Sequence, residues 1–341
     1  MKLNVAVVGI GYWGPNLVRN LTSLEGAQVS ALCDLDLARA ERVKERFCPQ
    51  ARVSNDHREV ADDPKIDAVV IATPVNNHFE LGSLFLSRGK HVFMEKPLAK
   101  TVDECTRLIE LAHHHQKTLM VGHVFVYNAA VVKIKDYLRN GELGKLLYIY
   151  SQRLNLGRIQ HDVSALWSFA PHDVSIVNYW LDEEPILVTA RGFSYLKTGI
   201  EDVVFVTLNY PSGVGLNLHL TWLDPQKVRL MTLVGTKKMV VYDDVSVDSK
   251  IKLYDKGILA LHEYMEAPPS FAEFQFQIRM GDVLIPRLSF SEPLQNECRH
   301  FLDCILDGKP PATDGLNGLG VVKVLQAAEE SMKRGGAPIE L

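Results

Sequence analysis

Short apolar runs alternate with amphipathic stretches along the first 122 residues of the chain. The apolar runs at 3–8, 28–33, 68–71, 91–94 and 118–121 have the length of buried strands, and the amphipathic stretches at 15–23, 37–47, 76–87 and 101–115 predict helices. Thr101 and Glu104 form a capping-box pattern at the start of the last helix. This alternation is typical of a doubly wound α/β fold, in which helices cover both faces of a parallel sheet.

The pattern changes after residue 122 to longer strands in which apolar and polar residues alternate with a period of two. The clearest pair is 202–210 and 214–222, joined by the turn sequence Pro211-Ser212-Gly213. Further strands are predicted at 146–154, 186–194, 228–234 and 239–242, and helices near 292–307 and 318–333. We therefore expect an α+β domain with a large, mostly antiparallel sheet.

At 341 residues the chain exceeds the usual size of a single core, so we expect two domains, 1–122 and 123–341. Hydrophobic residues make up 47% of the chain and charged residues 23%, as in ordinary globular proteins. The net charge is −4 and the basic residues are scattered, which argues against a nucleic-acid partner.

Neither a membrane segment nor a metal site is expected. The chain starts on a strand-like run without a charged and apolar leader, and no apolar stretch reaches 18 residues, so we expect a cytoplasmic protein. The five cysteines lack metal-site spacing and are interpreted as reduced thiols. Consecutive His113, His114 and His115 would point about 100° apart on a helix and cannot converge on one ion.

The segment Gly9-Ile10-Gly11-Tyr12-Trp13-Gly14 matches G-x-G-x-x-G and lies between the first strand and a helix. Its glycines allow a tight turn and close backbone approach to a pyrophosphate, as in the Rossmann dinucleotide fold. Free amides and the positive end of the helix dipole would face the phosphates. A glycine turn between strand and helix can also bind nothing, so the motif alone is weak.

Asp34 strengthens the dinucleotide interpretation, because it follows the second apolar run, where an acidic side chain can accept hydrogen bonds from both ribose hydroxyls. Leu35 rather than arginine comes next, so a 2′-phosphate would be repelled and NAD is preferred over NADP. The alternative is that Asp34 caps the helix that starts near Leu37.

Thr73-Pro74 follows the run 68–71, at the sheet edge where dinucleotides lie. Asn76 and Asn77 are better explained as helix caps. His78 could contact the cofactor or pack in the first turn of the helix.

Glu95-Lys96-Pro97 directly follows the run 91–94, and the proline disfavours helical geometry at Lys96. With this motif the chain resembles the glucose-fructose oxidoreductase, inositol dehydrogenase and rhizopine-catabolism (Gfo/Idh/MocA) family. The matching elements, which extend over nearly the whole chain, are the glycine motif, Ala72-Thr73-Pro74, His78, Gly89-Lys90-His91-Val92, Glu95-Lys96-Pro97-Leu98-Ala99, Gly122-His123 and Thr313-Asp314-Gly315. We assign the cofactor site to Gly9, Gly11, Tyr12, Trp13, Gly14, Asp34, Thr73, Pro74, His78, Glu95 and Lys96.

The resemblance implies that Lys96 contacts the nicotinamide ribose and the reacting hydroxyl, and that a histidine matching His172 is the acid/base. This agrees with the chemistry, since oxidation of a secondary alcohol needs a proton acceptor, and an unperturbed histidine pKa of ~6.5 suits that task. An ammonium would stabilise the developing alkoxide. The alternatives are a solvated Lys96 and a structural His172.

The sequence departs from the family in two places. Many members carry an aspartate four residues before the histidine, where this chain has Ser168, and neither Asp162 nor Asp173 can be assigned the role from sequence. Relatives also often carry Arg and Pro at the positions of Val126 and Ala129. Tyr127 and Asn128 therefore either contact the substrate or only pack and cap.

Within the family, three segments look like the nucleotide-sugar 3-dehydrogenases: 11–17, 155–158 leading to Trp167, and 170–173. That resemblance implies oxidation of the C3 hydroxyl of UDP-N-acetylglucosamine or its uronic acid to a 3-keto sugar for an aminotransferase. Arg153 and Arg158 are candidates for the substrate diphosphate, because a guanidinium pairs bidentately with phosphate. They can equally be exposed strand and loop arginines.

Two other functions remain open: a dehydrogenase of a free sugar or inositol, and a non-catalytic NAD-binding regulator. The resemblance further implies a homodimer or homotetramer built through sheet faces. The apolar alternation of Val204, Val206 and Leu208 suits such a face, but helices of the same subunit could cover it as well.

Overall fold

The computed structural model describes residues 2–157, 163–258, 278–289 and 291–341, and these form two compact units. The first unit comprises Met1–Asn128 and Ser291–Gln326, and the second comprises Ala129–Phe290 and Ala327–Leu341. From the sequence, the second domain was expected to comprise all of residues 123–341. The structure differs because the segment from Ser291 to Gln326 packs with the first unit.

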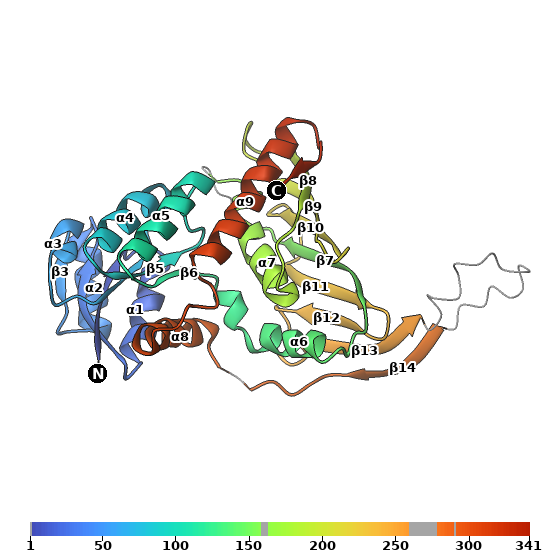
Figure 1. The fold of residues 1–341 in the computed structure, drawn as a ribbon, viewed down its shortest axis with the longest axis horizontal. Coiled ribbons are helices and arrows are strands. Elements are labelled where there is room, and N and C mark those ends of the chain that lie inside the picture. Colours follow the sequence, from blue (N-terminus) through green and yellow to red (C-terminus); the bar gives the residue numbers. More distant parts are fainter. Residues whose placement is uncertain (1, 158–162, 259–277, 290) are drawn as a thin grey trace, which may run out of the picture. The chain divides into compact units, whose positions relative to one another are not determined.

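The first unit, whose sheet is drawn in blue to cyan in Figure 1, contains six parallel strands in the order β3-β2-β1-β4-β5-β6. Its strands are β1 (Leu3–Val8), β2 (Ala27–Cys33), β3 (Arg52–Ser54), β4 (Ala68–Ile71), β5 (His91–Glu95) and β6 (Leu119–Gly122). The order reverses between β1 and β4, and in such sheets ligands bind at the carboxyl ends of the strands beside that reversal. The expected doubly wound fold is confirmed.

Helices cover both faces of this sheet. They are α1 (Gly14–Thr22), α2 (Leu37–Phe47), α3 (His57–Ala61), α4 (His78–Ser87), α5 (Val102–His114) and α8 (Pro293–Asp307), with short 3-10 turns η1 (Val75–Asn77) and η2 (Val124–Tyr127). Apolar residues of α1, α2 and α8 share one buried cluster with alternate residues of β1, β2 and β4. Within it, Phe301 of α8 packs edge-on against Phe93 of β5 with ring centres 5.6 Å apart. The C-terminal helix α8 is thus part of the core of the first unit.

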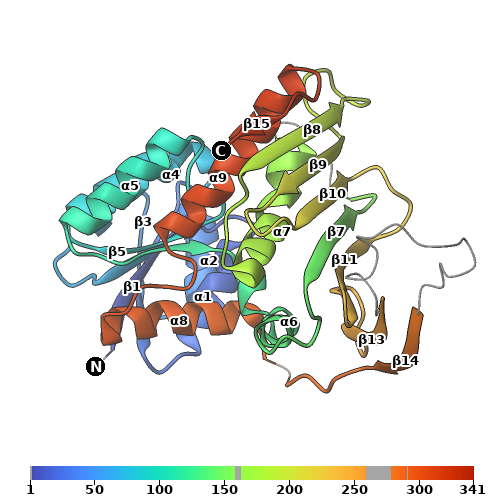
Figure 2. The same ribbon diagram turned by 45° about the vertical axis from the view of Figure 1, so that its right-hand side comes forward.

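The second unit contains a nine-stranded sheet in the order β14-β13-β12-β11-β7-β10-β9-β8-β15 (Figure 2). Its strands are β7 (Leu146–Leu154), β8 (Leu187–Phe193), β9 (Val203–Asn209), β10 (Gly215–Thr221), β11 (Val228–Gly235), β12 (Met239–Asp243), β13 (Ile251–Ile258), β14 (Ile278–Leu284) and β15 (Ile339–Glu340). Only the β7–β10 pair is parallel among the described pairings. The expected large, mostly antiparallel sheet is confirmed.

Helix α7 (Ala165–Leu181) packs on β9 and β10, and α6 (Ala129–Arg139) packs on α7. The expected hairpin of β9 and β10 is present, with Gly213 in its turn at φ +84°. Val204, Val206 and Leu208 are buried on the same face as Leu216, Leu218 and Leu220. A helix of the same subunit therefore covers the apolar face that the sequence analysis considered for self-association.

The last helix, α9 (Gly315–Lys333), begins in the first unit and ends in the second. Within the described part of the chain, no helix has the length and apolarity needed to cross a membrane.

Candidate active site

The glycine turn between β1 and α1 can be built only with glycine at two positions. Gly9 has φ +92°, and a Cβ there would lie 2.7 Å from the carbonyl group of Ala72. A Cβ on Gly14 would lie 2.2 Å from the carbonyl oxygen of Gly9. A Cβ on Gly11, by contrast, would meet nothing within 4 Å, so this side of the turn is open. The turn therefore has the open, side-chain-free surface that a dinucleotide pyrophosphate requires.

Asp34, directly after β2, is tied to this turn. Its carboxylate accepts hydrogen bonds from the backbone N–H groups of Ile10, at 2.6 Å, and Asp36, at 2.8 Å. The helix cap of α2 is Asp36, which accepts from the N–H of Arg39, so the alternative role of Asp34 as that cap is wrong. These two hydrogen bonds hold its carboxylate beside the glycine turn.

A pocket of about 510 Å³ opens at these carboxyl ends of the strands and lies within the first unit. Of the predicted cofactor residues it is lined by Gly9, Gly11, Asp34, Thr73 and Pro74. The polar lining residues that were not predicted for the cofactor are Asp36, Arg39, Asn55, His57, Asn77 and Glu80. Asn77 was interpreted as a cap but makes no capping hydrogen bond. Arg39 could have been noticed from its place in the first turn after Asp34. The glycine turn, Asp34 and the pocket together fit the adenosine and phosphate half of NAD.

Tyr12 and Trp13, the two aromatic residues of the turn, have different environments. Tyr12 is 86% exposed, whereas the ring of Trp13 packs against the buried cluster of the first unit. The indole N–H of Trp13 also donates to the carboxyl of Glu95.

His78 is buried, and it bonds backbone rather than facing a ligand. Its Nδ1 lies 2.8 Å from the carbonyl oxygen of Pro97, and its Nε2 lies 2.9 Å from that of Thr73. Burial lowers the pKa of the imidazole. Of the two alternatives, the structure favours a packed histidine, which here links the loop after β4 to the loop after β5.

Lys96 follows Glu95 at the carboxyl end of β5, and the Lys96–Pro97 peptide is cis. The backbone N–H of Lys96 donates to Glu95 Oε2 at 3.2 Å. Burial raises the pKa of Glu95 to about 7, while the Lys96 charge, the Lys96 N–H and the Trp13 N–H act in the opposite direction. The motif thus combines a lysine with the Glu95 carboxyl, which has a pKa of about 7 and bonds Trp13 of the glycine turn.

Two buried polar residues near this motif were not predicted as site residues. Glu297 of α8 and His123 after β6 are both fully buried, and their side-chain oxygens and nitrogens have no hydrogen-bond partner among the described residues. Burial raises the pKa of Glu297 well above its usual value and lowers that of His123 to about 3. No sequence signal identified Glu297, because its contribution depends on α8 returning to the first unit.

Tyr127 and Asn128 do not face open space as substrate contacts would. The Tyr127 hydroxyl lies 3.0 Å from Thr313 Oγ1, and Thr313 in turn donates to the carbonyl oxygen of Val121. Asn128 is only 8% exposed. The structure therefore favours packing over substrate contact for both, and it gives the Thr313-Asp314-Gly315 run a structural role beside β6.

In the second unit, His172 lies on α7, a helix that the sequence analysis did not predict. The following residue, Asp173, is fully buried and accepts from Arg153 Nε at 3.0 Å and from Ser151 Oγ at 3.0 Å. The Asp173 carboxylate thus pairs with two residues of β7. Asp162 lies outside the described residues.

The same pairing corrects the interpretation of Arg153. Its side chain is 7% exposed, and both Nε and Nη2 bond Asp173 Oδ1. A guanidinium buried in such a pair is not presented to a diphosphate, so we do not retain Arg153 as a phosphate contact. Arg158, the other candidate, lies outside the described residues.

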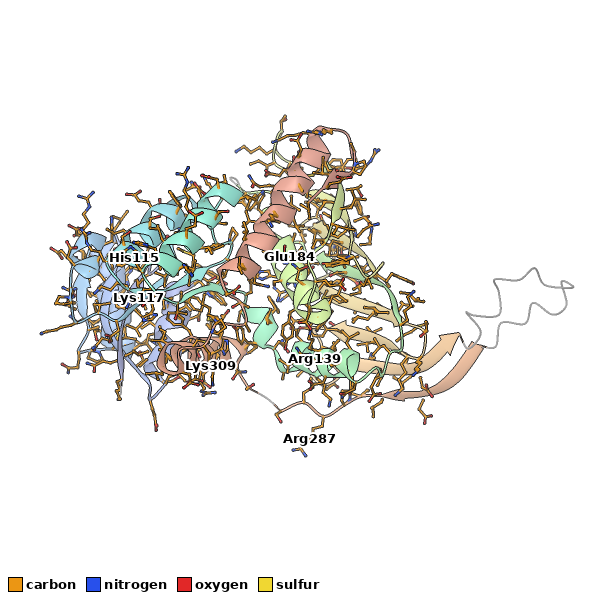
Figure 3. The ribbon with its side chains drawn as sticks, in the orientation of Figure 1. His115, Lys117, Arg139, Glu184, Arg287 and Lys309 are labelled. Carbon is orange, nitrogen blue, oxygen red and sulfur yellow. The ribbon has the colours of Figure 1, made fainter. Side chains whose placement is uncertain are left out.

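The histidine run at 113–115 lies at the C-terminal end of α5, where Figure 3 labels His115. Across the described ranges, no three His, Cys, Asp or Glu side chains are grouped so as to hold a metal ion. The five cysteines are all buried and form no disulfide.

Comparison with known proteins adds independent information. Residues 3–123 match the family model described as "Oxidoreductase family, NAD-binding Rossmann fold", and residues 131–241 match the "GFO/IDH/MocA C-terminal domain". The chain is 26% identical over its whole length to inositol 2-dehydrogenase 2 of Saccharopolyspora erythraea, and the match covers 96% of that protein. It is 27% identical to inositol 2-dehydrogenase of Salmonella paratyphi B over 63% of this chain, a match that spans 66% of that protein's length.

Among solved structures, the fold is similar to that of UDP-N-acetylglucosamine 3-dehydrogenase GnnA from Acidithiobacillus ferrooxidans. The TM-score is 0.82 at 20% identity, with 98% of each chain covered. The two family models together cover most of the chain. The protein therefore belongs to the Gfo/Idh/MocA family of oxidoreductases with an NAD-binding Rossmann domain.

Proposed function

We propose that the protein catalyses NAD-dependent oxidation of a secondary alcohol on a sugar or cyclitol ring, with Lys96 and His172 as its catalytic residues. One arrangement carries the proposal: the glycine turn, Asp34 and Lys96 lie at the carboxyl ends of β1, β2 and β5 of one sheet. A dinucleotide with its ribose at Asp34 would extend across the glycine turn towards β5.

The chain's own residues supply the acid–base part of this chemistry. His172 takes the proton of the substrate hydroxyl, and the Lys96 ammonium stabilises the negative charge that develops on that oxygen. NAD, held by the glycine turn and Asp34, would supply the hydride acceptor for this oxidation. Asp34 binds the ribose diol, and the open face of Gly11 lets the backbone approach the pyrophosphate.

The finer proposal is oxidation of the C3 hydroxyl of UDP-N-acetylglucosamine or its uronic acid, giving a 3-keto sugar suited to a transaminating enzyme. It is supported by the segments around Trp13, Trp167 and His172 and by the similarity of fold to GnnA. The buried pairing of Arg153 removes one of the two arginines first considered for the diphosphate.

Oxidation of inositol is the second candidate. A specific observation favours it: two of the most similar curated relatives are named inositol 2-dehydrogenases, and one of these matches over the full chain. Such a substrate needs no diphosphate contact, which agrees with the buried ion pair between Arg153 and Asp173.

Turnover with a panel of alcohols separates these candidates. The purified protein is incubated with NAD and, in turn, UDP-N-acetylglucosamine, its uronic acid, myo-inositol, scyllo-inositol and glucose, while absorbance of the reduced nicotinamide is followed. Lys96→Ala and His172→Ala should lower kcat by about 10²-fold or more. The exposed His113→Ala is the matched control and should turn over like wild type.

Each outcome has a distinct meaning. Turnover of UDP-sugars alone supports the finer proposal, and turnover of inositols alone supports the second candidate. Tight NAD binding without turnover of any substrate, including in the presence of a keto acid as hydride acceptor, would favour a regulator and contradict the proposed function.

We also infer self-association through the sheet face that α7 leaves uncovered. On that face Tyr148, Tyr150 and Phe205 are 47%, 36% and 41% exposed, an unusual run of aromatic side chains for a free surface. Light scattering after size exclusion should give a dimer or tetramer, and Phe205→Glu should shift it towards monomer. A wild-type monomer at all concentrations would contradict this.

A further inference from the structure

Glu297 carries a carboxyl group that is buried without a hydrogen bond to any described residue. The side chain is 0% exposed, and neither carboxyl oxygen has a hydrogen-bond partner in the described part of the chain. Burial raises its pKa well above the usual value, and the charge of Glu95 raises it further. A buried carboxyl without a partner lowers stability at neutral pH, and such groups concentrate at functional sites.

Its neighbour Glu95 is connected to the parts of the site that handle the cofactor. The carboxyl of Glu95 accepts from the indole of Trp13 in the glycine turn and from the backbone N–H of Lys96. A Cβ on Gly122, at the end of β6, would lie 3.2 Å from this carboxyl. Glu95 thus lies between the glycine turn and the end of β6, with Glu297 contributed by α8.

Apart from Lys96, the titratable groups described around this pair are uncharged at neutral pH. Burial lowers the pKa of His123 to about 3, and the Lys96 charge lowers it further. Burial likewise raises the pKa values of Tyr127 and Cys298 well above their usual ranges. Among the described groups near Glu297, the charge balance therefore depends on Lys96 and Glu95.

The direction of a bound dinucleotide follows from the sheet. Asp34 at the end of β2 takes the adenosine ribose, so the nicotinamide half extends to the other side of β1, over β4 and β5. Glu95 and Lys96 end β5. This step rests on the proposed function, because it uses the proposed orientation of NAD.

We propose that Glu95 is a proton-linked contact for the cofactor: its carboxyl releases a proton when the oxidised, cationic nicotinamide binds and keeps it when the reduced, uncharged nicotinamide binds. Glu297 remains protonated in both states, so that Glu95 alone responds to the charge of the ring. The physical basis is that a nearby positive charge favours the ionised carboxyl, whereas an uncharged ring does not.

Binding measurements without any sugar test this. Titration calorimetry at pH 7 in two buffers of different ionisation enthalpy counts the protons released on binding NAD or NADH. Because the pKa of Glu95 is about 7, NAD should bind about tenfold more weakly at pH 6 than at pH 8 if only the ionised form binds well. NADH affinity should change by less than about twofold over the same range, and its binding should release no proton.

Two isosteric variants identify the titrating group. Glu95→Gln should abolish both the pH dependence of NAD binding and the released proton, whereas Glu297→Gln should keep both, because an amide replaces an uncharged acid. Loss of the dependence in Glu297→Gln, or its persistence in Glu95→Gln, would overturn the assignment.

The binding data of the wild-type protein test the inference even if a variant does not fold. Equal, flat pH profiles for NAD and NADH with no proton release would overturn the inference while leaving the proposed function intact. If neither NAD nor NADH binds at any pH, the result would contradict the proposed function instead.

Discussion

The imidazole Nδ1 of His78 lies 2.8 Å from the carbonyl oxygen of Pro97, the residue after Lys96. The opposite ring nitrogen lies 2.9 Å from the carbonyl oxygen of Thr73, in the loop that lines the cofactor pocket. An uncharged imidazole carries one N–H and can donate to only one of these oxygens at a time. His78 therefore connects the cofactor loop with the Lys96 segment through one buried ring.

Replacement of His78 should impair positioning of Lys96 more than folding. His78→Phe keeps the ring volume but removes the donor, and it should lower kcat by about tenfold while costing about 1–3 kcal/mol of stability. His78→Gln keeps a donor and should recover part of the rate. Steady-state kinetics and urea unfolding check this, and wild-type kcat in His78→Phe would exclude a positioning role.

Asp34→Ser should change cofactor preference. The variant loses the carboxylate that accepts the ribose hydroxyls, so NAD should bind about tenfold more weakly. Arg39 has its Nη1 3.8 Å from Asp34 Oδ1 and its Nη2 3.3 Å from Asp36 Oδ2. With the Asp34 carboxylate gone, its guanidinium faces one carboxylate fewer and can pair with a 2′-phosphate, so NADP binding should improve. Fluorescence titration with both cofactors measures this.

The matched control is Asp56→Ser, a helix-cap aspartate that does not line the pocket. It should leave both affinities unchanged. The double variant Asp34→Ser with Arg39→Ala should lose the gain in NADP binding, and retention of that gain would show that Arg39 is not its source.

Arg153→Met should strongly destabilise the protein, because it leaves the Asp173 carboxylate buried without its cation. The expected loss is about 3–5 kcal/mol in urea unfolding, and adding Asp173→Leu should recover most of it. Arg334→Met, which removes an exposed pair with Glu330, should cost less than about 1 kcal/mol. A double variant that is stable but has lost UDP-sugar binding would restore Arg153 as a substrate contact.

Glu297→Gln should become more stable than wild type as pH rises. The pKa of Glu297 is raised in the folded protein, so the folded state binds this proton more tightly, and its advantage shrinks above the unfolded pKa of ~4.3. The free energy of unfolding of the variant minus that of wild type should grow by up to about 1.4 kcal/mol per pH unit from pH 5 upward. Thermal unfolding between pH 4 and pH 8 measures it.

Glu292→Gln, at the N-cap of the same helix, should show the opposite dependence of stability on pH. The hydrogen bond from Arg19 lowers the pKa of Glu292, so this carboxylate contributes stability above its unfolded pKa and loses it as pH falls. The Glu292 variant should be less stable than wild type at pH 7, and the difference should disappear in acid. For the Glu297 prediction of the preceding paragraph, the contradicting result is a stability difference between wild type and Glu297→Gln that stays constant with pH, because Glu297 would then ionise normally.

Most of the first unit could be predicted from sequence, because its strands are buried apolar runs and its helices carry local start signals. The capping box of Thr101 and Glu104 is present as expected. Strand β3 was missed because it has only three residues and begins with the exposed Arg52. The predicted cofactor residues that line the pocket lie within the strand ends and turns that the pattern itself identifies.

The second unit was predicted less completely. Helix α7 was missed because Pro171 lies inside it and most of its residues are buried, which removes the amphipathic pattern. The role of Arg153 depends on its pairing with Asp173, 20 residues away in the chain. In the first unit, likewise, the burial of Glu297 depends on the return of α8 to that unit. No local pattern distinguishes an arginine buried against Asp173 from one exposed to a phosphate.

The return of residues 291–326 to the first unit also has a consequence for biosynthesis. A ribosome makes the chain from its N-terminus, and domains usually fold as they emerge. Here the sheet that binds NAD is synthesised early, yet the helix that supplies Phe301 and Cys298 to its core is among the last segments made. The part of the apolar face that α8 covers therefore stays exposed on the nascent sheet throughout synthesis of the second unit, and this core can be completed only when translation is almost finished.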